Sequence, residues 1–198
     1  MTSRDPRATH PVDPVGDPLT FAVSGLMAEP PGTIRGYEIP PSVIRLDDAT
    51  ETAAPVVGRM RLTRTNRGLV VDARVSTALA GECSRCLRPV VTPVEARVDE
   101  EVLPSIDLAS GQPVPPEEDG DPEAARLTDH WELELRPLLA AAISLEEPIA
   151  PLCEPDCPGL CPECGERLEA GHGHGEEPID PRLEALRAFR VDADDESG

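Results

Sequence analysis

Six cysteines lie in two short stretches of the sequence, at spacings that are typical of metal ligands. "CSRCL" carries Cys83 and Cys86, and "CEPDCPGLCPECG" carries the other four, which are Cys153, Cys157, Cys161 and Cys164. Two thiolates separated by two residues can reach one zinc ion, because the chain between them forms a tight turn. In "CPECG", Pro162 stiffens that turn and Gly165 can adopt a positive φ where backbone amides approach the sulfur atoms. We therefore expect these thiols to bind metal.

Two histidines in "GHGHG" extend the set of candidate ligands. His172 and His174 follow shortly after Cys164, so the segment from Cys161 to His174 could form a compact site of two thiolates and two imidazoles. Eight candidate ligands suit two four-coordinate ions, and we expect the chain to bind one or two Zn²⁺ ions. The alternative is that both histidines are solvated residues of a Gly-rich loop.

A redox centre is the main alternative for the cysteines. Thioredoxin-like pairs open a helix in a βαβ unit, which lowers the pKa of the thiol, whereas "CSRC" lies between two predicted antiparallel strands. Free surface thiols at this density would oxidise or cross-link. Metal binding is therefore the favoured interpretation.

Alternating apolar residues predict the strands that position the first cysteine pair. Two alternating runs flank "TNRG", which indicates a β-hairpin, and "LTFAVSGL" (19–26) and "PPGTIRGYEIP" predict two earlier extended stretches. A further strand is expected at about 90–102. The side chains that should face the core are Leu69, Val71, Ala73, Val75, Leu79, Val94, Ala96, Val98 and Val102.

The second half of the chain predicts helices beside the cysteines. An apolar stripe that ends at Pro148 indicates one short helix, and "DPRLEALRAF" indicates another with Asp180 as its N-cap. The stripe consists of Leu138, Leu139, Ala142, Ile143 and Leu145. The predicted fold is α+β: a small antiparallel β-sheet that could close into a barrel, one or two short packed helices, and a zinc-knuckle C-terminal arm.

Composition divides the chain into five predicted regions. Its 24 prolines and an aromatic share of 2% indicate that much of the 198-residue chain is not core. The regions are a disordered tail at 1–18, a β-rich core at 19–102, a disordered acidic and Pro-rich linker at 103–128, a helix with a zinc-binding arm and a C-terminal helix at 129–190, and a disordered acidic end at 191–198.

The formal net charge of −20 disfavours broad binding to nucleic acid. The first 97 residues carry about +1 and the remainder about −21, so the acidic half should favour a basic protein partner, and no DNA binding is expected. The sequence has no run of 18 apolar residues and no apolar segment near its start, so we expect a cytoplasmic protein with no membrane contact.

One local group of arginines is a candidate RNA contact. Between residues 52 and 71 the sequence has no acidic residue but holds Arg59, Arg61, Arg64 and Arg67, on and beside the predicted hairpin. These side chains could meet phosphates along a small cationic edge. The alternative is an ordinary solvated strand face, and the scattered aromatic residues argue against base stacking.

Several motifs resemble the YceD family, the bacterial and plastid proteins named for large ribosomal RNA subunit accumulation. They occur in family order from about residue 19 to 190: "FAVSGL", "PPGTIR", "RGLVV", "GECSRCL", "LELRPLL", "PLCEPDCPGLCPECG" and "DPRLEAL". The resemblance implies one site of Cys83, Cys86, Cys153 and Cys157, and another of Cys161, Cys164, His172 and His174. Other members carry C-x-C where this chain has its two histidines.

The resemblance implies a role in accumulation or processing of 23S ribosomal RNA and in large-subunit assembly, with no catalytic activity. The expected partner is ribosomal RNA or an assembly intermediate, reached directly or through a basic ribosomal protein. The sequence itself offers no phosphate-binding Gly loop, no HExxH and no nucleophile beside a base, so we expect no enzyme. The alternative function is a zinc- or redox-responsive regulator or adaptor that binds a basic protein.

Overall fold

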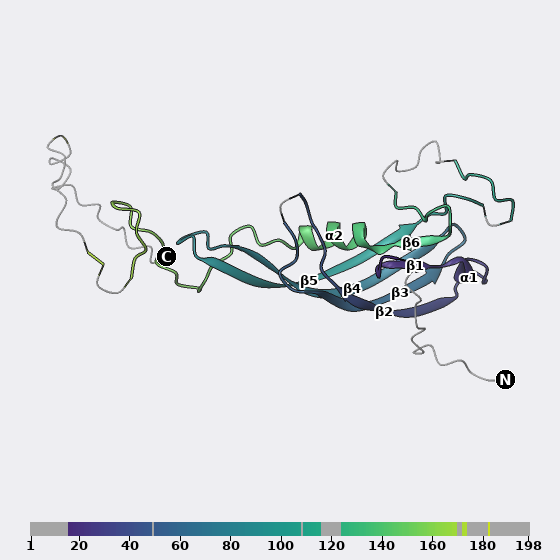
Figure 1. The fold of residues 1–198 in the computed structure, drawn as a ribbon, viewed down its shortest axis with the longest axis horizontal. Coiled ribbons are helices and arrows are strands. Elements are labelled where there is room, and N and C mark those ends of the chain that lie inside the picture. The colour runs from purple at the N-terminus through teal and green to yellow at the C-terminus, as the bar shows by residue number, and fades with distance from the viewer. Residues whose placement is uncertain are drawn as a thin grey trace, which may run out of the picture. The chain divides into compact units, whose positions relative to one another are not determined.

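The computed structural model describes residues 16–48, 50–107, 109–115, 124–169, 172–173 and 182 of the chain. The chain divides into two compact units, Met1–Cys157 and Pro158–Gly198. The first unit holds all the helices and strands that are labelled in Figure 1. None of the helices among the described residues is long and apolar enough to cross a membrane.

A four-stranded antiparallel sheet, in the order β2-β3-β4-β5, is the main element of the first unit (Figure 1). Its strands are β2 (Ile34–Ser42), β3 (Val56–Arg64), β4 (Leu69–Glu82) and β5 (Pro89–Val102). The predicted hairpin joins β3 to β4, and its turn is closed by the amide of Thr65 donating to the carbonyl of Gly68 over 3.0 Å. The antiparallel sheet is therefore confirmed.

The sheet does not close into a barrel, which the sequence had left open. β2 and β5 lie at opposite edges of the sheet and do not pair with each other within the described part of the chain. Four strands are too few to close around a core of side chains. Instead, a helix and a second, smaller sheet cover the apolar face of the four-stranded sheet.

The small sheet joins two segments that lie far apart in the sequence. β1 (Thr20–Ala22) pairs antiparallel with β6 (Glu132–Glu134), which the sequence analysis did not predict. The expected strand at 19–26 is only partly correct, because a short helix α1 (Ser24–Met27) follows β1 directly. After β6 the chain enters α2 (Leu135–Leu145), whose Arg136 donates two 2.9 Å hydrogen bonds to the carboxylate of Asp17.

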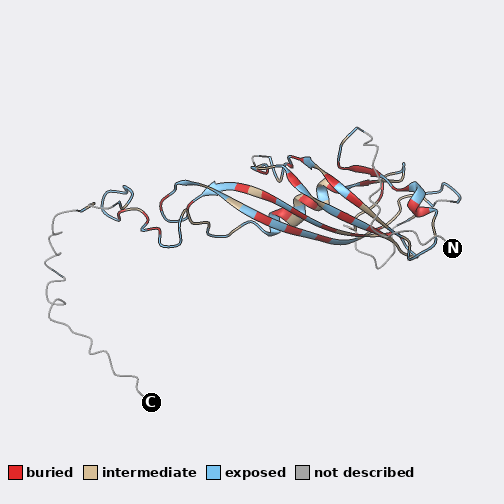
Figure 2. Ribbon diagram, turned by 90° about the horizontal axis from the view of Figure 1, so that it is seen from below, coloured by how far each residue is buried: buried red, intermediate tan, exposed pale blue. Residues whose placement is uncertain are grey.

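The core lies between α2 and one face of the four-stranded sheet. Buried and exposed residues alternate along the long strands (Figure 2), and every residue predicted to point inward from β4 and β5 is buried. The helix stripe is only partly correct. Leu139 and Ile143 are buried, but Leu145 is 85% exposed because it lies about 200° around the helix from Ile143.

Part of the segment predicted to be a linker packs against the sheet. The amide of Leu103 donates to the carbonyl of Ala125, and the amide of Leu127 donates to the carbonyl of Leu103. The Leu127 side chain is buried in the core. Residues 108 and 116–123 lie outside the described part, as do the N-terminal tail to residue 15, the acidic end and the predicted C-terminal helix apart from Arg182.

Candidate metal centres

The connection between β4 and β5 presents the first pair of thiols. The amide of Cys83 donates to the carbonyl of Arg88 over 2.8 Å, and the amide of Leu87 donates back to the carbonyl of Cys83 over 2.9 Å. Leu87 takes a positive φ of 57°, which closes the turn. This tight turn brings Cys83 and Cys86 onto one side, and both side chains are buried.

The chain that leaves α2 brings the second pair of thiols to this turn. It runs beside the far end of β4 and β5 (Figure 1), where the amide of Ser84 donates to the carbonyl of Pro151 over 2.8 Å. Arg85 donates from Nη1 to the carbonyl of Cys157 over 3.0 Å. These two contacts bring Cys153 and Cys157 to the β4–β5 turn.

The four thiols form one cluster in the first unit. All four Sγ atoms lie within 4.8 Å of one another. Cys83 Sγ lies 3.7 Å from Cys157 Sγ, and Cys86 Sγ lies 3.6 Å from Cys153 Sγ. In a tetrahedron with metal–sulfur bonds of zinc length, neighbouring sulfur atoms are about 3.8 Å apart. The donor set and its spacing therefore fit a four-coordinate metal ion.

The first cluster holds its thiols at very different pKa values. Burial acts to raise the pKa of Cys83, but the backbone amides of Cys153, Arg85 and Cys86 outweigh it and lower the pKa to about 6. Burial raises the pKa of Cys153 to about 12, helped by the neighbouring thiols, of which Cys157 has the largest effect. A metal ion would therefore find one thiolate already formed near neutral pH and would displace a proton from Cys153.

The second unit carries a smaller cluster on a turn of the same design. The amide of Cys161 donates to the carbonyl of Glu166 over 2.6 Å, and the amide of Gly165 donates to the carbonyl of Cys161 over 2.9 Å. Gly165 has the expected positive φ, 74°. Two bonds and one left-handed residue thus recur at the same positions in both turns, with Gly165 in the place of Leu87.

Three ligand atoms converge in this second cluster. Atoms of Cys161, Cys164 and His172 lie within 4.8 Å of one another, and Cys164 Sγ is 3.6 Å from His172 Nε2. A tetrahedral zinc ion would hold a sulfur and an imidazole nitrogen about 3.6 Å apart. The fourth predicted ligand, His174, lies outside the described residues.

The thiols of the second cluster also differ in pKa. The backbone amide of Cys164 is the largest influence on Cys161, and with the amide of Glu163 and His172 it lowers the pKa of that thiol to about 6 despite burial. At Cys164 the amide of Glu166 acts to lower the pKa, but burial and the nearby Cys161 sulfur raise it overall. Cys161 is therefore the thiolate to which a metal ion would first bind.

Residues 71–190, which include all six cysteines, match the family described as large ribosomal RNA subunit accumulation protein YceD. The chain belongs to this family. An uncharacterized protein of Mycobacterium tuberculosis is 33% identical over 175 residues, which cover 87% of this chain and 81% of the relative. An uncharacterized protein of Mycobacterium leprae is 29% identical over 167 residues, which cover 83% of this chain and 74% of the relative. No solved structure matches the chain significantly.

The four predicted arginines have different surroundings. Arg61 pairs with Asp72 at 2.6 Å and Arg67 pairs with Glu101 at 3.6 Å. Arg64 donates to the backbone carbonyls of Met27, Thr65 and Gly68. Arg59 has no ion pair or hydrogen bond from its side chain within the described part of the chain. Arg59 and Arg61 line one groove, whereas Arg64 is bound to backbone carbonyls. RNA contact by the four stays a prediction.

The sequence did not predict two features of the first cluster. One is Arg85, whose bond to Cys157 links the two cysteine pairs. The other is the left-handed backbone of Leu87. Alignment of "CSRCL" with "CPECG" would have placed Leu87 opposite Gly165 and revealed it, whereas nothing local in the sequence predicts the long-range contact of Arg85.

Proposed function

We propose that this YceD-family protein is a non-enzymatic cytoplasmic factor that supports accumulation or processing of 23S ribosomal RNA during large-subunit biogenesis. The observation that carries the proposal is the family match over residues 71–190. That span includes β4 from Val71 onward, all of β5, the helix α2 and both cysteine clusters. The family match therefore supports a ribosomal role for the part of the chain that carries the candidate metal sites.

Each cluster would hold one structural Zn²⁺ ion. Cys83, Cys86, Cys153 and Cys157 supply a complete set of four sulfur donors, and Cys161, Cys164 and His172 supply three donors that His174 would complete. The thiolates and imidazole are ligands that zinc prefers. Zinc in the first site would fix the chain after α2 to the β4–β5 turn, because the ligands come from both segments.

A structural role for zinc agrees with a protein that is not an enzyme. Catalytic zinc sites keep one coordination position for water or substrate. The first cluster offers four thiols that lie close enough to fill every position of a tetrahedral ion. Both the donor set and its burial therefore favour a closed site.

The proposed partner is ribosomal RNA or an intermediate of the large subunit, met directly or through a basic ribosomal protein. Depletion of the protein should reduce the large-subunit peak in a sedimentation profile and raise the level of 23S precursors. Restoration with the wild-type chain should reverse both effects. A normal profile with normal 23S precursor levels after depletion would contradict the proposal.

A zinc- or redox-responsive regulator is the second candidate, and the close thiols favour it. Cys83 and Cys157, at 3.7 Å between sulfur atoms, would need only a small shift to form a disulfide once metal is lost. Metal analysis and thiol titration on protein purified under reducing conditions distinguish the two candidates. Two tightly held zinc ions favour the structural role, and metal-free thiols that oxidise readily favour the regulator.

A further inference from the structure

Three arginines stand directly opposite one another on the face of the sheet that α2 does not cover. Arg59 of β3 pairs in register with Arg74 of β4, and Arg74 pairs in register with Arg97 of β5. All three side chains are exposed. Neighbouring strands are about 4.8 Å apart, so this arginine row spans about 10 Å across the sheet.

The arginine row places like charges opposite one another between β3 and β4 and between β4 and β5, with Glu38 of β2 opposite Arg59 at its end. Like charges that face each other across a ladder destabilise a sheet. Arg97 is compensated by Asp99 at 3.2 Å and by Asp72 at 3.9 Å. Among the described residues, Arg59 and Arg74 make no ion pair or side-chain hydrogen bond. An anion placed over these two guanidinium groups would remove the repulsion and occupy their donors.

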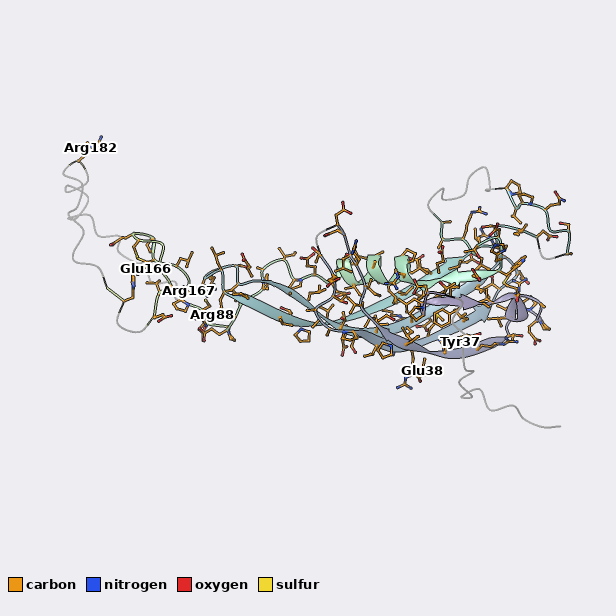
Figure 3. All side chains as sticks on the ribbon, viewed as in Figure 1. Tyr37, Glu38, Arg88, Glu166, Arg167 and Arg182 are labelled. Carbon is orange, nitrogen blue, oxygen red and sulfur yellow. The ribbon has the colours of Figure 1, made fainter. Side chains whose placement is uncertain are left out.

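The row lies in a wide groove on this face of the sheet. The groove has a volume of about 1170 Å³, and its lining includes the three arginines together with Arg61 and Glu38. Glu38 lies on the side of the sheet away from α2 (Figure 3). Sites for small molecules are mostly apolar and about 300–1,000 Å³ in volume. This groove is slightly larger, and its lining is charged, with four arginines and the four carboxylates of Glu38, Asp72, Glu95 and Glu146. A phosphate ligand must therefore bind at the arginines that those carboxylates leave unpaired.

The acidic residues of the face limit where phosphates can lie. Asp72 forms an ion pair with Arg61 at 2.6 Å, so the Arg61 side of the groove is already neutralised. Glu38 is in register with Arg59 at one end of the row, and Glu95 lies two residues from Arg97 on β5, at the other end. Glu146 also lines the groove. Arg59 and Arg74 are therefore the donors left for a ligand, with Arg97 next to them.

The groove offers no exposed aromatic ring. Tyr37 is the aromatic residue of its lining, and that side chain is buried. Stacking of unpaired bases needs accessible rings, whereas contacts to the phosphate backbone need only cations. The ligand chemistry that fits is therefore a sugar-phosphate backbone, bound with little preference for base sequence, and the proposed function makes that backbone RNA.

We propose that Arg59 and Arg74, flanked by Arg97, form a binding site for the phosphate backbone of RNA on the open face of the sheet. This inference rests on the proposed function and deepens it, because it assigns the RNA contact to these strands. It differs from the cationic edge expected from the sequence, which included Arg61, Arg64 and Arg67.

The direct test is binding of transcribed 23S ribosomal RNA fragments to the purified full-length chain at several salt concentrations. Arg59→Ala and Arg74→Ala should each weaken binding about tenfold or more, and together they should reduce the slope of log affinity against log salt by about 2. Arg45→Ala is the matched control, since Arg45 is an exposed arginine with no ion pair among the described residues and lies outside the groove. It should leave both quantities unchanged.

Folding of the variants is checked by thermal melting, which should stay at the wild-type temperature or rise as repulsion is relieved. A double variant that binds RNA like the wild type would overturn the inference. The inference would also be overturned if the double variant lost no more RNA affinity than Arg45→Ala does. It would equally be overturned if the wild-type chain bound a basic ribosomal protein but none of the RNA fragments.

An experiment in cells distinguishes failure of this inference from failure of the proposed function. In depleted cells, the double variant should fail to restore large-subunit levels that the Arg45→Ala chain restores. Full restoration by the double variant would overturn the RNA site while leaving the proposed function intact. Normal subunit levels after depletion alone would overturn the proposed function itself.

Discussion

The Sγ atoms of Cys83 and Cys157 lie 3.7 Å apart although 74 residues separate them in the sequence. One comes from the β4–β5 turn and the other from the chain beyond α2. A metal ion shared by these two thiols closes a long loop, and its binding free energy must offset the lost entropy of that loop.

Cys83→Ser should remove one zinc ion and destabilise the first unit. Structural zinc binds with a free energy on the order of 10 kcal/mol per site, and that energy contributes to folding. Metal analysis and thermal melting of the zinc-loaded chains measure both effects. Cys164→Ser is the control, since it should also lose one ion but leave the melting of the sheet unchanged. Two retained ions, or wild-type melting of Cys83→Ser, would show that the first cluster holds no structural metal.

Zinc binding should release protons, and the number released should increase as the pH falls. At pH 7 the thiols of Cys83 and Cys161, each with a pKa of about 6, are largely thiolates, whereas Cys153, with a pKa of about 12, is protonated. As the pH falls below about 6, Cys83 and Cys161 gain protons that zinc must displace, so the affinity falls. An indicator dye in weakly buffered metal-free protein measures the release. An affinity that is unchanged or tighter at pH 5 than at pH 7 would refute this.

The two cysteine turns should respond oppositely to substitution at their left-handed residue. Leu87 has a φ of 57° and Gly165 a φ of 74°. A side chain in this region costs roughly 1–2 kcal/mol. Gly165→Ala should therefore weaken zinc binding at the second cluster, whereas Leu87→Gly should leave the first cluster as tight or tighter, because the Leu87 side chain is half exposed. Competition with a chelator measures both. Equal losses in the two variants would contradict the shared turn geometry.

Gly58→Ala should destabilise the sheet that carries the arginine row. A Cβ at Gly58 would collide with the backbone carbonyl of Arg74 and lie 2.9 Å from Val75. The loss should be on the order of 2 kcal/mol in the free energy of unfolding. Gly36→Ala is the control, since nothing beyond its chain neighbours lies within 4 Å of a Cβ there, on the edge strand β2. Urea unfolding of both variants decides the point, and equal stability would be inconsistent with this packing.

The local part of the fold could be predicted from the sequence. Alternation at Leu69, Val71 and Ala73 identified the buried face of β4, because a half-buried strand has a period of two. The position of Cys83 and Cys86 between two strands followed from the same alternation. Spacing within "CPECG" was enough to predict the positive φ of Gly165.

The non-local part could not be predicted in this way. β6 has only three residues, and its pairing with β1 depends on contacts such as Phe21 with Leu133 that no local pattern encodes. The arginine row depends on strand register, since Arg59, Arg74 and Arg97 come from three strands. A group taken from one stretch of sequence included Arg64, which binds backbone carbonyls instead.

The ratio of mature 23S to 16S ribosomal RNA in depleted cells, with and without the restored wild-type chain, tests the central claim most directly. A factor for large-subunit RNA accumulation predicts that the ratio falls on depletion and recovers on restoration, while 16S RNA stays constant. An unchanged ratio, or an equal fall of both RNAs, would contradict the account.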